Sequence, residues 1–315
     1  MEKVLVTGAS GFIGSELVNK LDAKGYEVEV LERYVTGRYS LGKKSNHILH
    51  YASLTDYPAI KNIIRESQPD YVVHLAAISA VAFSYDHFIE VSQANYLGTI
   101  NLAEACHREV NHFKQFVFAG TSEEYGVTLK DKGKPLTEDS QLSPNSPYAV
   151  AKVAGDLYLK YMHLAYNFPY TVLRPFNTYG RKNNNHFFIE SVVSQMLTQD
   201  KVFLGDPDAV RDWLYVDDHV DGYVKALGNS KAIGHEIQLC TGKAYTTRET
   251  ADLIAKLTGF KGEIVWNATP KRPLDAFVLI GDSSKAKKLL DWEHKTSLEE
   301  GLKKIIVQLR AGTAK

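Results

Sequence analysis

The sequence predicts an α/β protein, with a Rossmann-type doubly wound parallel sheet and a smaller C-terminal substrate-binding lobe. Three observations support this fold. Short apolar runs alternate with longer amphipathic stretches through the first half of the chain, which is the rhythm of βαβ units. The runs are apolar on both faces, as expected where helices cover both sides of a parallel sheet. A glycine-rich turn connects the first run to the first amphipathic stretch.

The elements follow one another in the order that this fold requires. The predicted strands are Val4–Thr7, Val28–Leu31, Tyr71–Ala77, Gln115–Thr121 and Thr171–Pro175. The predicted helices are Phe12–Lys24, Asp56–Glu66, Ser92–Arg108 and Pro147–Tyr166. After Asn177 the elements become shorter and are interrupted by Asn, Gly and Pro. Two later helices carry capping boxes, Thr246 with Glu249 and Ser297 with Glu300, so the C-terminal part is expected to be folded.

Composition excludes several classes of protein. The 315 residues include 37 Lys plus Arg and 37 Asp plus Glu, so no overall field favours nucleic acid or an anionic membrane. Two separated cysteines, Cys106 and Cys240, argue against a disulfide framework and against structural zinc. His47 and His50 would face opposite sides of a strand, so no metal site is expected there. With no leader and no long apolar stretch, we expect a cytoplasmic protein.

The glycine-rich turn has the features of a dinucleotide site. Its spacing, Gly-x-x-Gly-x-x-Gly, allows close approach of the backbone to a pyrophosphate at the positive end of a helix. Glu32 ends the second strand, where a carboxylate can accept hydrogen bonds from the ribose diol and repel a 2′-phosphate. This favours NAD, although the adjacent Arg33 leaves NADP possible. Contacts to the dinucleotide are expected at Gly8, Gly11, Phe12, Ile13, Gly14, Glu32 and Arg33.

A tyrosine and a lysine four residues apart form the predicted reacting centre. Tyr148 and Lys152 follow Pro147, which suits the first turn of a helix, so both side chains share one helical face. A lysine cation near a phenol favours the phenolate and lowers its pKa, which gives an acid/base group near neutrality. The pair alone is a weak signal, but it is strong together with the glycine turn.

The chain resembles the NAD(P)-dependent epimerase/dehydratase family, the extended short-chain dehydrogenases/reductases. The resemblance covers nearly the whole chain. No single motif identifies the family, but their combination does. These motifs are TGASGFIG at 7–14, LAA at 75–77, NYLGT at 95–99, TSEEYG at 121–126, YAVAK at 148–152, RPFNTYG at 174–180, RDWLYVDDH at 211–219 and RPLD at 272–275.

Within this family, the residues Thr121, Ser122 and Glu123 resemble the form found in the GDP-mannose type of nucleotide-sugar 4,6-dehydratase. The resemblance implies that Thr121, Tyr148 and Lys152 support oxidation at C4 of an NDP-hexose. Glu123 then removes the C5 proton and protonates the leaving C6 hydroxyl, and hydride returns to C6. Ser122 stands where glucose-type dehydratases have an aspartic acid. The product would be an NDP-4-keto-6-deoxyhexose.

Other readings remain open on the sequence alone. The family also contains NDP-sugar 4-epimerases, which usually lack the carboxylate, and UDP-glucuronate decarboxylases, some of which carry Thr-Ser-Glu. A purely structural role is the alternative for Glu123, as a cap or an ion-pair partner at a strand end, because perturbed carboxylates also serve structure. A non-enzymatic dinucleotide-binding protein is the alternative from another class. The presence of both Tyr148 and Lys152 argues against it.

The resemblance also implies the remaining contacts and the domains. Residues 1–175, with returning elements near 212–240, would form the NAD(P)-binding Rossmann domain, and 176–211 with 241–315 the nucleotide-sugar-binding lobe. A homodimer would form through the helices that contain Ser92 and Tyr148. Further dinucleotide contacts are implied at Ser53, Leu54, Leu75, Ala76, Ala77 and Asn95. Contacts to the substrate diphosphate or ribose are implied at Asn177, Arg211, Arg272 and Asp275. Two motifs depart from the family: Ser53 replaces an aspartate, and Arg181 replaces the proline of RPFNxxGP.

Overall fold

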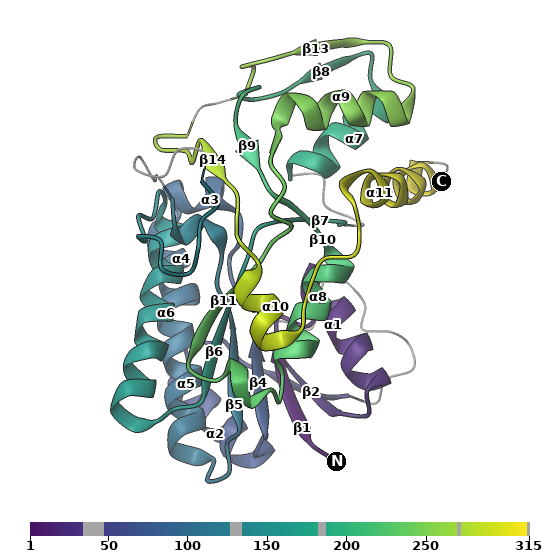
Figure 1. Ribbon diagram of the computed structural model, residues 1–315. Helices are drawn as coiled ribbons and strands as arrows, with labels where there is room; N and C mark the ends of the chain where they lie inside the picture. The colour runs from purple at the N-terminus through teal and green to yellow at the C-terminus, as the bar shows by residue number, and fades with distance from the viewer. Residues whose placement is uncertain (34–46, 127–133, 182–186, 270–271, 314–315) are drawn as a thin grey trace.

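A seven-stranded parallel sheet forms the centre of the larger part of the molecule (Figure 1). The computed structural model describes residues 1–33, 47–126, 134–181, 187–269 and 272–313. The strand order is β11-β6-β5-β4-β1-β2-β3, and every neighbouring pair is parallel. The strands are β1 (Lys3–Thr7), β2 (Glu27–Glu32), β3 (Ile48–Tyr51), β4 (Tyr71–His74), β5 (Gln115–Ala119), β6 (Tyr170–Pro175) and β11 (His235–Leu239). The predicted Rossmann-type fold is confirmed.

Helices cover both faces of this sheet, and the central strand shows why. Val4 and Val6 of β1 pack into one core and Leu5 into the other, and all three are fully buried. One face carries α2 (Tyr57–Ser67), α5 (Gly98–Glu109) and α6 (Pro147–Tyr166). The other carries α1 (Phe12–Ala23) and α8 (Val216–Ala226). The short helices α3 (Val81–Asp86) and α4 (Phe88–Ser92) lead through a π-helical turn, Gln93–Leu97, into α5.

The smaller lobe lies beyond the carboxyl ends of the strands (Figure 1). Its strands form three small sheets: β7 (Asn177–Tyr179) with β10 (Trp213–Tyr215), β9 (Val210–Arg211) with β12 (Tyr245–Thr246) and β14 (Val278–Leu279), and β8 (Lys201–Phe203) with β13 (Glu263–Val265). Its helices are α7 (Phe188–Thr198), α9 (Thr247–Thr258) and α11 (Leu298–Thr313), while α10 (Ser284–Leu290) packs beside β11. Both predicted capping boxes are present. The exact domain boundaries stay a prediction.

Several elements differ from the sequence prediction in ways that shape the site. β4 ends at His74 and β5 at Ala119, so the residues that follow each strand are free to form loops at the edge of the sheet. Thr121 does not continue β5 but begins a 3-10 turn, Ser122–Glu124. The third strand, β3, was considered around His47 and His50 but received no predicted bounds, because its residues are largely exposed and form no long apolar run.

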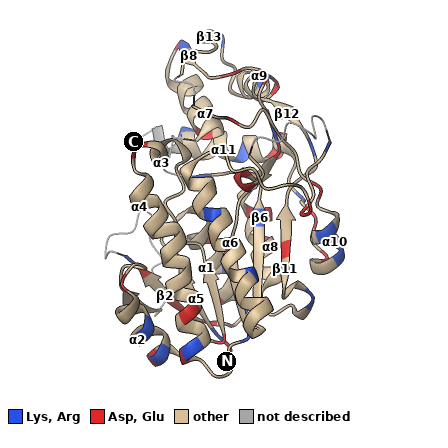
Figure 2. Cartoon of the chain, turned by 90° about the vertical axis from the view of Figure 1, so that its left-hand side faces the viewer, with Lys and Arg blue, Asp and Glu red and all other residues tan. Residues whose placement is uncertain are grey.

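No helix in the described part of the chain is long and apolar enough to cross a membrane. Acidic and basic residues are interspersed over the surface, as the balanced composition predicts (Figure 2).

Candidate active site

The glycine-rich turn is shaped by close backbone contacts. Gly8 has φ of +70°, and a Cβ there would lie 2.8 Å from the backbone nitrogen of Ala76. A Cβ on Gly14 would lie 2.2 Å from the carbonyl oxygen of Gly8, so α1 could not pack this closely on the turn with any larger residue. Gly11 is the N-cap of α1 and no side chain caps the helix there. The backbone N–H groups of the first turn, which includes Phe12 and Ile13, can therefore receive an anion.

The loop after β4 forms the wall opposite this turn and is held by buried hydrogen bonds. Thr7 Oγ1 lies 2.7 Å from His74 Nδ1 and accepts the backbone N–H of Ala76 at 3.2 Å. Burial lowers the pKa of His74 to about 3, so its ring is neutral. The Asn95 side chain bonds both backbone groups of Ile78, at 2.8 and 3.0 Å. Residues 75–77 are thus fixed from both ends, and Asn95 acts by holding the loop.

The residues predicted to contact the adenosine end lie at the adjoining edge of the sheet. Glu32 accepts hydrogen bonds from the backbone N–H and the hydroxyl of Ser10, at 2.7 and 2.8 Å. A carboxylate has about four lone-pair positions, so acceptor capacity remains for a ribose diol. Arg33 lies 3.8 Å from the carboxylate of Glu90. Ser53 bonds Thr55, and the Leu54 side chain packs against Gly98.

Tyr148 and Lys152 lie on α6 as predicted, but the pKa of the phenol is raised, whereas the sequence suggested that it would be lowered. Burial raises the pKa of Tyr148, and the carboxylate of Glu123 raises it further, whereas a hydrogen bond to Thr121 opposes this. Lys152 donates to the carbonyl of Ala119 at 2.8 Å. Burial lowers the pKa of Lys152 to about 8. Desolvation is the largest cause of the pKa shift of both groups, and the spacing of the two residues in the sequence could not reveal it.

The 3-10 turn after β5 places Thr121, Ser122 and Glu123 next to the reacting tyrosine, Tyr148. Thr121 caps the turn, accepting the backbone N–H of Glu123 at 3.3 Å. Ser122 and Glu123 are both buried. Within the described residues, the Oε2 atom of Glu123 is buried and has no hydrogen-bond partner. Its charge acts on Tyr148 and on Arg211, so it lies near both of these residues.

Sequence reasoning passed over Glu124, which was expected to point away from the site in an extended segment. It is fully buried and lies 3.0 Å from the guanidinium of Arg174, which also bonds Asp156 at 2.6 Å. Its Oε1 accepts the backbone N–H of Thr121 at 2.9 Å. No pattern in the sequence points to this contact, because Arg174 stands fifty residues further along the chain.

Three of the four predicted substrate residues are joined through one carboxylate. Asp275 lies 3.2 Å from the Nη2 of Arg211 and 3.6 Å from the Nη1 of Arg272. Arg211 is buried and Arg272 is about one third exposed. Two guanidinium groups at the mouth of the site suit a diphosphate. Asn177 follows β6, and its Oδ1 is another buried oxygen without a partner in the described chain.

Arg181, which replaces a proline of the family motif, packs against the phosphate turn. Its guanidinium lies 4.6 Å from the centroid of the Phe12 ring and 3.5 Å from that of Phe187. It donates to the carbonyl of Thr178 and lies 3.5 Å from Glu190. The arginine therefore links the loop after β7 to the N-terminus of α1.

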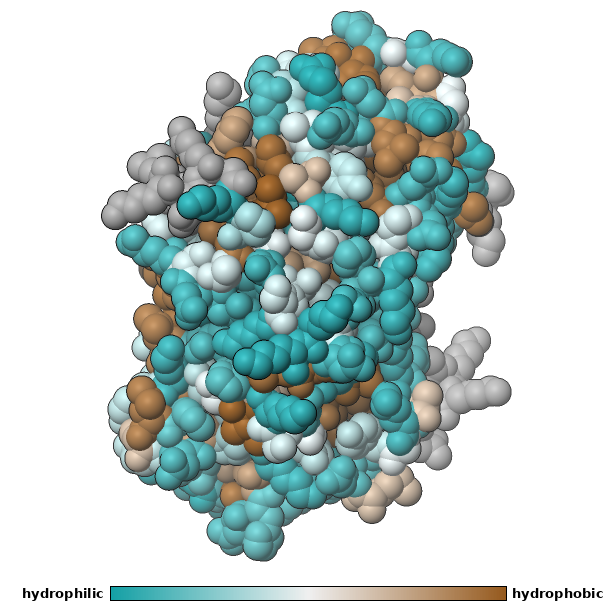
Figure 3. All heavy atoms as spheres, viewed as in Figure 1, coloured by the Kyte–Doolittle hydropathy of each residue, from teal (hydrophilic) through white to brown (hydrophobic). Residues whose placement is uncertain are grey.

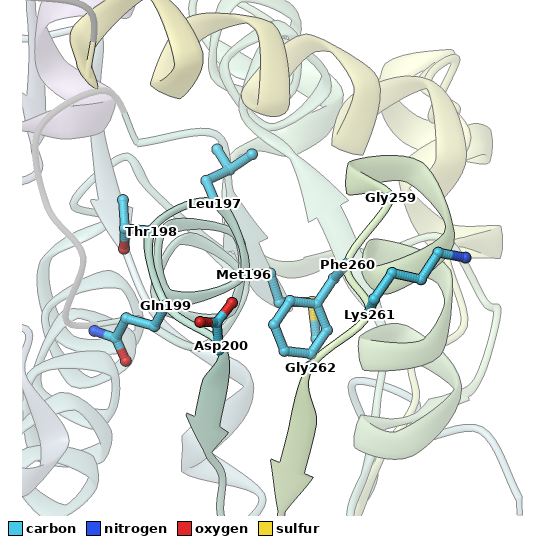
Figure 4. Close-up of a pocket in the computed structure, with 9 residues that line it drawn as sticks. All are labelled: Met196, Leu197, Thr198, Gln199, Asp200, Gly259, Phe260, Lys261 and Gly262. Atoms are coloured by element: carbon cyan, nitrogen blue, oxygen red, sulfur yellow. The ribbon is translucent and has the colours of Figure 1, made fainter.

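A separate cavity of about 590 Å³ opens at the C-terminal ends of α7 and α9 (Figure 4). None of the predicted site residues lines it. Its walls are formed by Met196, Leu197, Thr198, Gln199, Asp200, Gly259, Phe260, Lys261 and Gly262.

The motifs and their geometry agree with comparison to known proteins. The profile of the family described as GDP-mannose 4,6 dehydratase matches residues 5–305, almost the entire chain. The chain belongs to this family. It is thus a member of the wider NAD(P)-dependent epimerase/dehydratase group that its motifs predicted.

Members and relatives of the GDP-mannose 4,6-dehydratase family differ in activity. A UDP-glucose 4-epimerase of Mycolicibacterium smegmatis is 32% identical over 319 residues, covering 96% of this chain and 97% of that protein. The structure of a UDP-glucose 4-epimerase from Thermotoga maritima with UDP-glucose has a TM-score of 0.91 and 32% identity, and the alignment covers 99% of each chain. A Thermus thermophilus UDP-glucose 4-epimerase in complex with NAD has a TM-score of 0.87 and 30% identity, covering 98% of this chain and 99% of that one. Family membership therefore leaves the reaction to be argued from the site.

Proposed function

We propose that this enzyme is a nucleotide-sugar 4,6-dehydratase of the GDP-mannose type. The observation that carries the proposal is the buried Glu123 oxygen, which has no hydrogen-bond partner among the residues that the structure describes and whose carboxylate acts electrostatically on Tyr148. A 4-epimerase needs only to move a hydride and the C4 hydroxyl proton. A dehydratase also needs a group that removes the C5 proton and protonates the leaving C6 hydroxyl, and a carboxylic acid can do both.

NAD is the cofactor that the site fits best, with NADP possible. The uncapped N-terminus of α1 and the close packing at Gly8 and Gly14 suit a dinucleotide diphosphate. Glu32 suits an unmodified ribose diol, and NAD is bound by the similar Thermus thermophilus epimerase. Held at the glycine-rich turn and Glu32, the cofactor would supply reversible hydride transfer for C4 and C6 of the sugar.

The protein groups have separate roles in this scheme. Tyr148 takes the proton of the C4 hydroxyl, and Thr121, which hydrogen-bonds Tyr148, stabilises the developing ketone. The 4-ketone acidifies the C5 proton, which Glu123 removes. Glu123 then delivers that proton to the C6 hydroxyl, so that water leaves. Arg211 and Arg272 hold the substrate diphosphate, and Asp275 holds the two arginines.

We further propose a homodimer through α4 and α6. These helices carry exposed apolar side chains, of which Leu164 is 77% exposed. The charge view faces this side of the molecule and shows few charged residues on α6 (Figure 2). Apolar side chains also follow the left edge of the space-filling view, where α6 lies (Figure 3). The exposed apolar residues on these helices include Phe88, Ile89, Val150, Leu157 and Leu164.

A panel of nucleotide sugars tests the proposed reaction. The purified enzyme is incubated with GDP-, UDP- and dTDP-hexoses and with UDP-glucuronate, and each product is followed by mass. Loss of one water from a hexose supports the dehydratase. An isomer of unchanged mass would establish a 4-epimerase, and loss of carbon dioxide a decarboxylase.

A further inference from the structure

Behind the catalytic turn lies a buried cluster with more acid than base. Glu124 and Asp156 both approach the guanidinium of Arg174. All three side chains are nearly or fully buried. Among the described residues, Arg174 is the cation in ion-pair contact with both carboxylates, while Lys152 contacts neither and acts on Glu124 only at longer range. Two buried carboxylates that share one contacting cation are costly to keep ionised together.

The contacts show how the cluster avoids this charge. Arg174 directs both Nε and Nη2 to one Asp156 oxygen, at 3.0 and 2.6 Å, so Asp156 is the ionised partner. Glu124 uses Oε1 to accept the N–H of Thr121. Its buried Oε2 accepts no hydrogen bond from any described residue, although it lies 3.0 Å from the Arg174 Nε. An Oε2 that carries a proton explains this arrangement, because a hydroxyl donates to a neighbouring carboxylate and need not accept.

We infer that Glu124 and Asp156 share one proton, and that the resulting neutral cluster is a positioning device for the turn that carries Thr121 and Glu123. Glu124 connects the cluster to the turn, because its Oε1 accepts the backbone N–H of Thr121, the residue that caps the turn. Burial and the charge of Asp156 raise the pKa of Glu124, in the direction that a shared proton requires.

Several titratable groups face the cluster from the elements packed around it. The charge of Glu124 raises the pKa of both Lys152 and Tyr148, so ionising it would disturb the reacting centre directly. The groups are Tyr125 at the end of the turn, Tyr148 and Lys152 on α6, Arg174 on β6, Glu138 before α6 and Glu236 on β11. These surrounding groups are the same in wild type and in the Glu124 variants. A difference between wild type and variant therefore reports on the proton that Glu124 and Asp156 share.

Infrared difference spectroscopy tests the shared proton without any substrate. The wild-type protein at neutral pH should show the carbonyl band of a protonated carboxylic acid that is absent from Glu124→Gln and present in Glu123→Gln. Asp156→Asn should also lose the band, because the remaining Glu124 would ionise beside Arg174. This second variant provides the same test if Glu124→Gln does not fold. Persistence of the whole protonated-acid signal in both variants would overturn the inference.

Proton linkage gives a second, independent measurement. If folded Glu124 keeps a proton that the unfolded chain releases, stability falls as pH rises above the ordinary glutamate pKa. Between about pH 5.5 and about pH 7, the unfolding equilibrium constant of wild type should therefore rise roughly tenfold per pH unit relative to Glu124→Gln. Parallel pH dependences for the two proteins would contradict the shared proton.

The positioning role is tested by rescue, and only this part rests on the proposed function. Glutamine can donate to Asp156 and accept from Thr121, as protonated glutamate does. Glu124→Ala should lower kcat by about tenfold or more with little change in KM, whereas Glu124→Gln should restore it to within about twofold at neutral pH. Equal activity in all three proteins would refute the positioning role. Failure of every nucleotide sugar to react would refute the proposed function but leave the infrared and linkage results intact.

Discussion

Replacing Glu123 by glutamine should separate hydride transfer from dehydration. Glutamine has nearly the volume of glutamate, and the affected Oε2 is buried without a partner among the described residues, so no hydrogen bond is lost. The change removes the group that takes the C5 proton. Loss of a positioned acid/base costs about 10²- to 10⁴-fold in rate, equivalent to roughly 3–5 kcal/mol in the barrier.

Oxidation at C4 should survive this substitution. The Glu123 carboxylate raises the pKa of Tyr148, so its removal makes the phenolate easier to form. After mixing with the true substrate, Glu123→Gln should accumulate reduced cofactor, visible in absorbance, while product appears slowly. Tyr148→Phe serves as the matched control and should show neither reduced cofactor nor product. Dehydration by Glu123→Gln at the wild-type rate would show that Glu123 is structural and would favour a 4-epimerase.

Three other substitutions test the remaining parts of the account. Lys152→Met should abolish activity yet stabilise the free protein at pH 7 by up to about 3 kcal/mol, since the buried lysine pKa of about 8 lies below its ordinary value. Wild-type stability rises as pH increases from about 8 to about 10.5, so denaturant titrations should show this difference narrowing over that range. Arg272→Ala should weaken nucleotide-sugar binding about tenfold or more in calorimetry and leave NAD binding unchanged, with the distant Lys261→Ala as control; equal loss of both ligands would indicate misfolding. Leu164→Glu should give a monomer in light scattering whereas Val307→Glu, 68% exposed on α11, should not, and an unchanged dimer would exclude the α6 face.

The parts of the fold that were predicted correctly depend on local rules. Glycines at fixed spacing after a buried strand define the turn at Gly8 and Gly14 because backbone atoms leave no space for a Cβ. Tyr148 and Lys152 share a face because the helical period places them there. The start of α6 was predicted at Pro147 because proline suits the first turn of a helix, and the structure adds Ser146 as the residue that caps it.

The features that the sequence did not reveal depend on contacts distant along the chain. Glu124 turns inward because Arg174 and Asp156 lie beneath a 3-10 turn, and an extended segment would have placed it elsewhere. The raised pKa of Tyr148 results from burial, which no spacing of residues encodes. The path of Arg181 back to Phe12 likewise depends on how the lobe packs on the sheet.

The reaction in heavy water tests the central claim most directly. Elimination removes the C5 hydrogen as a proton through Glu123, and C5 is later reprotonated from a group in exchange with solvent, whereas the hydride moves from C4 to C6 without exchange. The product formed in heavy water should therefore have lost one water and gained one deuterium at C5, with none at C6. Two results would contradict the role assigned to Glu123. One is a product with the same elemental composition as the substrate, and the other is a dehydrated product without deuterium at C5.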